Sequence, residues 1–571
     1  MKKLAGLMAL LMSLSCFTAC DISALLGGLG VGNNSSVEAP TGEVALEVLG
    51  EQEAITLQKG ESKTYAVNKD ISGKDYIKLL VNTNVSLVGQ FKYHNVADVN
   101  EIVTEDFFIE PSAEDVEFKQ FFDNFRINGH GLFDKQLLSI SITNVEETEG
   151  KIQVKKATVT DRKIDDYERE LYVSNKNIKV GADLATGGTL TYLERLNYGG
   201  QTIDEVVKDG EVQIGIDMKS KLDEANGDQF LSSQVNLINI YDAGRQFQQS
   251  YYANVGGVDA DTPAEMRKNG YSNTVLPKDY GKNGYERGFC TTADINGYYW
   301  PYNPVQGGDV NSNPSQIIDY EVSEKEIYIK VRAMDWSKGD TGKGYTGTVV
   351  GGVTTKSYME NWYSIDANNM VYVRNRFIDW NGFEGLEDVP AHSNELPAAY
   401  VVQPLHNYVC YTGDIGEAWD GELTKIPDLG PWNVVAHVNS ATSENGDCVE
   451  KWFAWVNDDD FGVGVFIPGT DAFASGRSSS RVDIDYKGNK DAYTSPLTNE
   501  YRYNKPEAVS PFTSCYVTNT SYTAPVVNWT MKSYVPMEYT YVISVDYVPV
   551  MRNNFKKLRT KVTNETLSAW K

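Results

Sequence analysis

The sequence predicts an all-β protein, with an N-terminal β-sandwich domain followed by a much larger antiparallel β-sandwich domain. Apolar and polar residues alternate in many short segments, which is the period of a half-buried strand. Helical periodicity is scarce, and no regular alternation of strand and helix indicates a parallel sheet. The composition agrees, because the 571 residues include 35 Tyr and 10 Trp, which favour sheets. A chain of this length is expected to form two or three domains.

The first domain is expected over residues 43–162. Its predicted strands are Glu43–Leu49, Ile77–Asn82, Val85–Tyr93, Leu138–Asn144 and Ile152–Thr160. Between them, Pro111–Phe122 suggests a helix or loop that buries its phenylalanines. The segment Lys163–Glu170 is charged and has no apolar period, so we interpret it as a linker.

The second domain is expected over residues 171–552. Its predicted strands are Val212–Met218, Ile317–Val331, Tyr358–Asp366, Met370–Asp379, Tyr400–Val409, Trp452–Val456, Gly462–Ile467 and Tyr539–Tyr547. Long loops rich in Gly, Asn and Asp separate them, notably Gly256–Gly288 and Trp336–Thr355. Residues 553–571 suggest a basic, weakly amphipathic tail.

The first twenty residues indicate export. A positive start at Lys2 and Lys3 precedes the apolar run Leu4–Phe17, which is too short to span a bilayer. The run ends in FTAC, and this pattern resembles a bacterial lipoprotein signal, which implies that Cys20 carries the lipid. The alternatives are an ordinary secretory signal cut near Ala19 or before the preceding cysteine.

The residues after the signal suit a tether. Residues 21–42 are rich in Gly, Ser and Asn and have no period that could bury a face, so they predict a flexible stalk. We therefore expect an exported protein of the cell envelope, attached to the lipid bilayer through Cys20. The sequence leaves open which membrane leaflet it occupies.

Charge and aromatic content narrow the partners. The net charge of −26 argues against nucleic acid, because phosphates require basic surfaces. Many Tyr, Trp and Asn residues suit sugar recognition, in which aromatic faces and amides bind the ring and its hydroxyls. The alternative is that the aromatic residues fill large sheet cores. Four widely spaced cysteines leave disulfide pairing open and match no zinc pattern: Cys290, Cys410, Cys448 and Cys515.

Three segments hold more polar and aromatic residues than turns need: NIYDAGRQFQQSYY from Asn239, YWPYNPVQGGD from Tyr299 and HSNELPAAY from His392. We expect them to line one pocket of the large domain. The predicted ligand-binding residues are Arg245, Gln249, Tyr252, Trp300, Asn303, Gln306 and Asp309.

Alternatives exist for several of these residues. Arg245 could bind a hydroxyl or carboxylate, or pair with Asp242 within the fold. Trp300 could stack on a sugar or plug a loop. Asp309 could bind ligand or cap a turn, or it could join a calcium site with the nearby asparagines, the only cofactor that the sequence suggests.

His392 and Glu395 are the best acid–base candidates, with Asp242 as a third catalytic candidate. A carboxyl group at the mouth of a sheet, near His and aromatic residues, can acquire the raised pKa of a general acid. The alternative is a surface salt link. Motifs of serine hydrolases, zincins, P-loop NTPases and NAD enzymes do not occur.

The segment GADLATGGTLTYL from Gly181, followed by NIYDAGRQFQQSYY, resembles the opening of a galactose-mutarotase-like β-supersandwich. The segment WFAWVNDDDFGVGVFIP from Trp452 is also similar to such enzymes. The resemblance implies a large antiparallel sheet with a sugar site, and hence a carbohydrate-active enzyme that hydrolyses, eliminates from or epimerises a glycan. The alternative is a glycan-binding or structural surface lipoprotein without turnover.

Overall fold

In the computed structural model the chain divides into two units, Met1–Thr41 and Gly42–Lys571. All the residues that the structure describes belong to the second unit. They are residues 42–47, 49, 53–95, 98–122, 135–161, 170–198, 201–202, 236–238, 246–251, 304–308, 314–335, 354–380, 394–401, 405–427, 450–468, 470, 472–478, 520–527 and 533–559. Within them, no helix combines the length and the apolar character required to cross a membrane.

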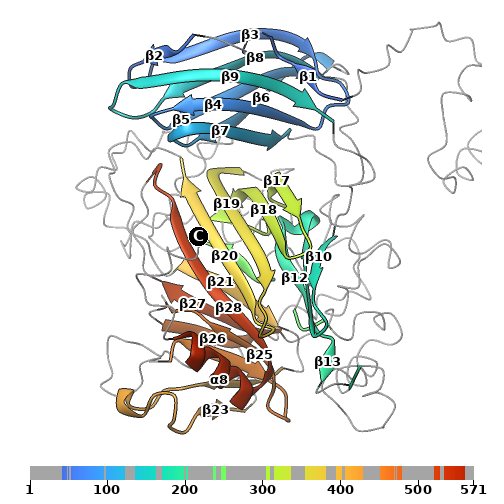
Figure 1. Cartoon of the computed structure of the whole chain (residues 1–571), viewed down its shortest axis with the longest axis vertical. Helices are drawn as coiled ribbons and strands as arrows, with labels where there is room; N and C mark the ends of the chain where they lie inside the picture. The colour runs from blue at the N-terminus through green and yellow to red at the C-terminus, as the bar shows by residue number, and fades with distance from the viewer. Residues whose placement is uncertain are drawn as a thin grey trace, which may run out of the picture. The chain divides into compact units, whose positions relative to one another are not determined.

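The N-terminal part is a sandwich of two antiparallel sheets (Figure 1). One sheet contains β1 (Val44–Ala45), β2 (Ile55–Leu57), β4 (Tyr76–Thr83), β7 (Ser112–Phe121) and β9 (Gly150–Thr160). The other contains β3 (Ser62–Asp70), β5 (Leu87–Asn95), β6 (Asp98–Ile109) and β8 (Lys135–Asn144). Side chains from both sheets, among them Leu79 and Phe91, share one core, because strict alternation turns every second residue inward.

One prediction for this domain is wrong. Pro111–Phe122 contains the strand β7, which pairs with β4, and not a helix or loop. Glu114, Asp115 and Glu117 make this segment polar, but they lie exposed along a strand that ends in the buried Phe121. The register against β4 therefore overrides the low strand propensity of these acidic residues.

A large antiparallel sheet of fourteen described strands forms the second part. Its first half contains β15 (Gln248–Ser250), β16 (Pro304–Val305), β17 (Gln316–Val322), β18 (Glu326–Asp335), β19 (Thr354–Ile365), β20 (Val371–Asp379) and β21 (Asn394–Val401). Its second half contains β22 (Asn407–Cys410), β23 (Thr424–Ile426), β24 (Trp452–Val456), β25 (Phe461–Phe466), β26 (Ala472–Ser478), β27 (Thr520–Val527) and β28 (Met537–Tyr547). Strands β28, β20, β19 and β18 lie side by side in this order.

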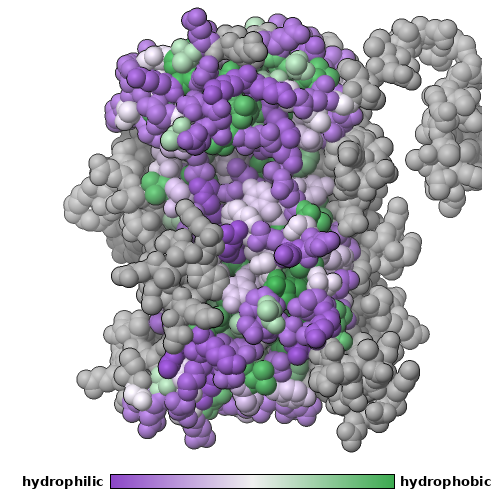
Figure 2. Space-filling view, in the orientation of Figure 1, coloured by the Kyte–Doolittle hydropathy of each residue, from purple (hydrophilic) through white to green (hydrophobic). Residues whose placement is uncertain are grey.

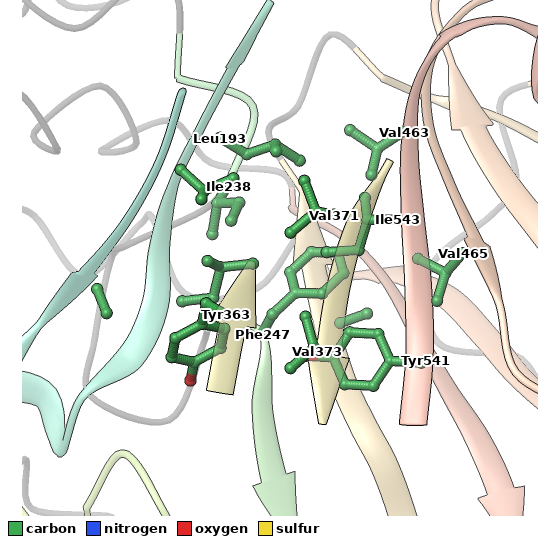
Figure 3. Close-up of a cluster of buried hydrophobic side chains, with 14 of the residues drawn as sticks. Leu193, Ile238, Phe247, Tyr363, Val371, Val373, Val463, Val465, Tyr541 and Ile543 are labelled. Carbon is green, nitrogen blue, oxygen red and sulfur yellow. The ribbon is translucent and has the colours of Figure 1, made fainter. Parts of the chain in front are cut away.

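A small sheet and the large one bury a common core. The small sheet contains β10 (Glu170–Ser174), β11 (Ile178–Asp183) and β12 (Thr189–Arg195), and a separate pair contains β13 (Asn197–Tyr198) and β14 (Gln201–Thr202). In Figure 3, Leu193 and Ile238 point toward Val371 and Ile543 of the large sheet. The side of the large sheet that faces this core is called the inner face below, and its other side the outer face. The all-β, antiparallel fold class predicted from the sequence is confirmed.

Two predicted strands are pairs of strands. Ile317–Val331 is the hairpin of β17 and β18, which turns at Ser323, where a hydroxyl accepts from the backbone N–H of Glu326. Tyr400–Val409 holds the end of β21 and the beginning of β22. Val212–Met218 lies outside the described residues.

The only described α-helix, α8, spans Val548–Leu558 and therefore crosses the predicted boundary at Arg552. It packs Met551 and Phe555 against β24 and β25, on the outer face. A buried ion pair fixes it there: Arg552 contacts Glu450, whose side chain is wholly buried. The first residues of the segment that we expected to be a tail thus form the end of this helix.

Candidate functional site

Most of the predicted site residues lie outside the described residues. These are Asp242, Arg245, Tyr252, Trp300, Asn303, Asp309, His392 and the lipidation residue Cys20, together with Cys290, Cys448 and Cys515. Cys410 is buried with a free thiol, and burial raises its pKa to about 12. Within the described part of the chain, no group of three or more His, Cys, Asp or Glu residues could hold a metal ion.

The structure does bring together the three remaining candidates, Gln249, Gln306 and Glu395. The backbone N–H of Gln249 donates to Oε1 of Gln306 at 3.2 Å, and the backbone N–H of Gln306 donates to the carbonyl of Gln249 at 3.1 Å. Ser250, the neighbour of Gln249, is the register partner of Glu395 in β21. Residues from all three predicted segments therefore meet at β15.

The two glutamine side chains are fully buried and bonded to the protein. Nε2 of Gln249 donates to the carbonyl of Glu360 at 3.0 Å and to Oδ1 of Asn361 at 2.8 Å. Nε2 of Gln306 donates to the carbonyl of Gly187 and to the hydroxyl of Tyr363. Both side-chain amides thus donate their hydrogen bonds to groups of the protein at the inner face of the large sheet. Their ligand-binding roles, and the catalytic role of the half-buried Glu395, stay predictions.

A row of side chains from three neighbouring strands lies on the outer face. Because register partners share a face, Tyr328 of β18, Trp362 of β19 and Arg374 of β20 form a line across three strands. The rings of Tyr328 and Trp362 are 5.1 Å apart between centroids, and the Arg374 guanidinium lies 4.8 Å from the Trp362 ring. All three residues are half-buried. This line is called the aromatic row below.

A row of alternating charges runs beside the aromatic row. It contains, in strand order, Asp319, Lys330, Glu360, Arg376 and Glu538. Nη1 of Arg376 donates to Oε2 of Glu360 at 2.6 Å, and the guanidinium also contacts Glu538 at 3.5 Å. Opposite charges at directly paired positions stabilise a sheet. The N-terminal sandwich adds to this row, since Glu110 pairs with Arg376 and Lys119 pairs with Asp319 at 2.5 Å.

Electrostatics keeps the carboxylate nearest the aromatic row ionised. Burial acts to raise the pKa of Glu360, but Lys330, Arg376 and a 2.7 Å hydrogen bond from the Tyr328 hydroxyl together lower it. Burial raises the pKa of the Tyr328 phenol well above its ordinary value, and the neighbouring Glu360 raises it further. Asp319, at the far end of the charged row, has a pKa raised by burial. The aromatic row therefore borders a hydrogen-bond acceptor and not a proton donor.

This face shows pale, weakly polar residues between hydrophilic ones in Figure 2. Our reading of the sequence missed it, although the signal was present. In Tyr358–Trp362 the large polar and aromatic residues occupy every second position, and Arg374 and Arg376 repeat this spacing on β20. Such a pattern predicts a strand face that carries polar and aromatic groups instead of core residues.

No protein-family model matches this chain, and a comparison with curated proteins finds no match. Among solved structures, a putative mutarotase from Salmonella typhimurium is similar, with 6% identity and a TM-score of 0.25 over 66% of this chain and 90% of that one. A homologue of aldose epimerase from C. elegans has 8% identity and a TM-score of 0.26 over 66% and 97%.

A third similar structure is shorter. It is a family 11 carbohydrate-binding module from Clostridium thermocellum, solved with a β-1,3-1,4-mixed-linked tetrasaccharide, with 11% identity and a TM-score of 0.16 over 22% of this chain and 98% of that one. Identities and TM-scores this low assign neither an activity nor a substrate to this chain.

Proposed function

We propose that this protein binds glycans through the aromatic row on the outer face of its large sheet. The observation that carries the proposal is the half-buried Trp362 on the outer face, flanked by Tyr328 and Arg374 and bordered by the ionised Glu360. A sugar presents apolar C–H groups and hydroxyls to its binding site. The indole and phenol rings suit the former, and the Arg374 guanidinium suits the latter.

Binding without turnover is the form of the proposal that these residues support. A glycosidase needs one carboxyl group that holds a proton near neutral pH and a second one across the scissile bond. Glu360 is instead held ionised by Lys330 and Arg376. A shallow aromatic strip beside an ionised acceptor binds a ligand without supplying acid catalysis.

The proposal places the protein in the cell envelope, tethered by a lipid on Cys20. This part rests on the sequence alone, in which an apolar run ends in FTAC and a Gly- and Ser-rich segment follows. Cys20→Ser should leave an unprocessed or freely soluble product in the producing bacterium. Unchanged partitioning of that variant into the membrane fraction would show that the tether lies elsewhere.

Binding is tested with residues 42–571 on an array of neutral and acidic oligosaccharides, and the affinity of the strongest hit is then measured by titration calorimetry. Trp362→Ala should weaken that affinity by about 2 kcal/mol, roughly 30-fold, as expected for a central aromatic anchor. Tyr547→Ala is the matched control, because it removes an aromatic residue that is 42% exposed but lies at the far end of β28, outside the aromatic row. Equal losses in both variants, or an array without hits, would contradict the proposal.

A further inference from the structure

The inner face of the large sheet contains a pair of buried asparagines. Asn361 of β19 and Asn375 of β20 are direct register partners, and Asn375 is in turn opposite Tyr539 of β28. Asn361 is 1% exposed and Asn375 is 2% exposed. Two amides facing each other inside a core require an account of every donor and acceptor, because buried polar groups are normally hydrogen-bonded.

Neighbouring groups fix the orientation of both amides. Oδ1 of Asn361 accepts from Nε2 of Gln249 at 2.8 Å, so its Nδ2 points away from Gln249. Nδ2 of Asn375 donates to the carbonyl of Val373 at 3.2 Å, so its Oδ1 is the remaining group. Among the residues that the structure describes, neither Nδ2 of Asn361 nor Oδ1 of Asn375 has a hydrogen-bond partner. A donor and an acceptor are thus left on adjacent strands.

The surroundings of this pair are neutral. Gln249 is an amide, and the hydroxyl of Tyr251 donates to its Oε1 at 2.9 Å. Burial raises the pKa of Tyr251 and Tyr539 well above the ordinary phenol value, so both rings remain uncharged. Glu360, Arg374 and Arg376 of the same strands lie on the opposite face, and Asp379, on the same face as Asn375, is four residues further along β20. A charged group would pay a large desolvation cost here without a counter-charge.

We propose that Asn361 and Asn375 form a buried site for one neutral hydroxyl oxygen, carried by a water molecule or by a small polyol. The Cβ atoms of directly opposed residues are about 4.5–5.5 Å apart, so one oxygen can reach both side chains. That oxygen accepts from Nδ2 of Asn361 and donates its proton to Oδ1 of Asn375. Gln249 is a positioning residue, because its bond to Asn361 aims the donor.

The test is a crystal structure of the full chain, grown without polyols, at a resolution that locates ordered water. We expect an oxygen peak about 2.7–3.2 Å from both Nδ2 of Asn361 and Oδ1 of Asn375. A second crystal is soaked in erythritol. Density that extends from the same position assigns the site to a polyol hydroxyl, whereas an unchanged single peak assigns it to water, and both results support the shared chemistry.

Two results would overturn the proposal. One is the absence of a peak within reach of both atoms, and the other is a direct hydrogen bond between the two amides. Asn375→Leu provides a further check, because it removes the acceptor and should abolish the peak. Gln249→Leu removes the hydrogen bond to Asn361, so the Asn361 amide should be displaced and the peak weakened or shifted. If Gln249 only filled space, the leucine would leave the peak unchanged. Neither variant touches the aromatic row, so failure here leaves the proposed glycan site unaffected.

Discussion

Arg376 connects three carboxylates, and removing its charge is the sharpest test of the electrostatics beside the aromatic row. Its guanidinium pairs with Glu110, Glu360 and Glu538, and its side chain is 17% exposed while that of Glu360 is 12% exposed. In Arg376→Gln, the positive neighbour that Glu360 keeps among the described residues is Lys330. Breaking a buried pair from one side costs about 3–5 kcal/mol, and the residual exposure places our expectation near 3 kcal/mol at pH 7.

The pH dependence gives the prediction its sign. The pKa of Glu360 in the folded protein lies below its ordinary value of 4.5, so its stabilising contribution is present above that value and is lost as the pH falls through the folded pKa. Without Arg376, two of the influences that lower the pKa of Glu360 are lost, so this pKa should be higher in the variant than in the wild type. The variant then loses less stability on acidification, and its difference in stability from the wild type should shrink toward pH 4.

Urea unfolding of residues 42–571 at pH 7, 5.5 and 4 measures this difference. Arg374→Gln is the matched control on the same strand, because Arg374 is 32% exposed and its contact with Glu326 is 3.9 Å long. Exposed pairs contribute little, so the control should lose no more than about 1 kcal/mol at any pH. A loss in Arg376→Gln that is below about 1 kcal/mol, or that is the same at all three pH values, would refute the reasoning.

The other predictions concern stability. Gly188→Ala should destabilise the fold by about 3 kcal/mol, because its φ is +65° and a Cβ there would lie 2.4 Å from Ile329. Gly60→Ala, with a φ of +76° and no atom within 4 Å, should lose only about 1 kcal/mol in the same thermal unfolding assay, and equal losses would contradict the packing argument. Burial raises the pKa of Glu194 despite the hydrogen bond from Tyr192, so the wild type should lose stability as the pH rises through that pKa. Glu194→Gln should remove this loss in unfolding curves from pH 4 to 8, and an unchanged pH profile would contradict the assignment.

The fold class could be predicted because two independent signals agree. Alternation marks strands such as Met370–Asp379, and the buried face it predicts is the face that packs in the core. The bounds of strands and helices were harder to predict where pairing with a distant segment determines them. The acidic β7 is a strand because it pairs with β4. The helix α8 packs its apolar residues against the outer face at β24 and β25. Neither partner is visible from the local sequence.

The candidate site was harder to predict for a different reason. A glutamine that binds a sugar and a glutamine that closes a sheet core have the same local sequence signal. Gln249 and Gln306 were chosen for their polar surroundings, and their amides bond to the backbone carbonyls of Glu360 and Gly187. Two of the chosen segments are neighbours in the sheet, since β15 and β21 carry Ser250 opposite Glu395. The shared pocket itself stays a prediction, because most of its residues lie outside the described part of the chain.

The two faces of β19 show how one strand separates these uses. Asn361 faces inward, where every polar atom must find a partner, and its neighbours are amides and uncharged phenols. Glu360 and Trp362 lie on the outer face, where Arg376 pairs with Glu360 and Arg374 lies over the Trp362 ring. A ligand that approaches from solvent meets only the outward set without rearrangement of the core. The aromatic row is therefore the surface that we propose for a large glycan, and the asparagine pair is the site that we propose for a single hydroxyl oxygen.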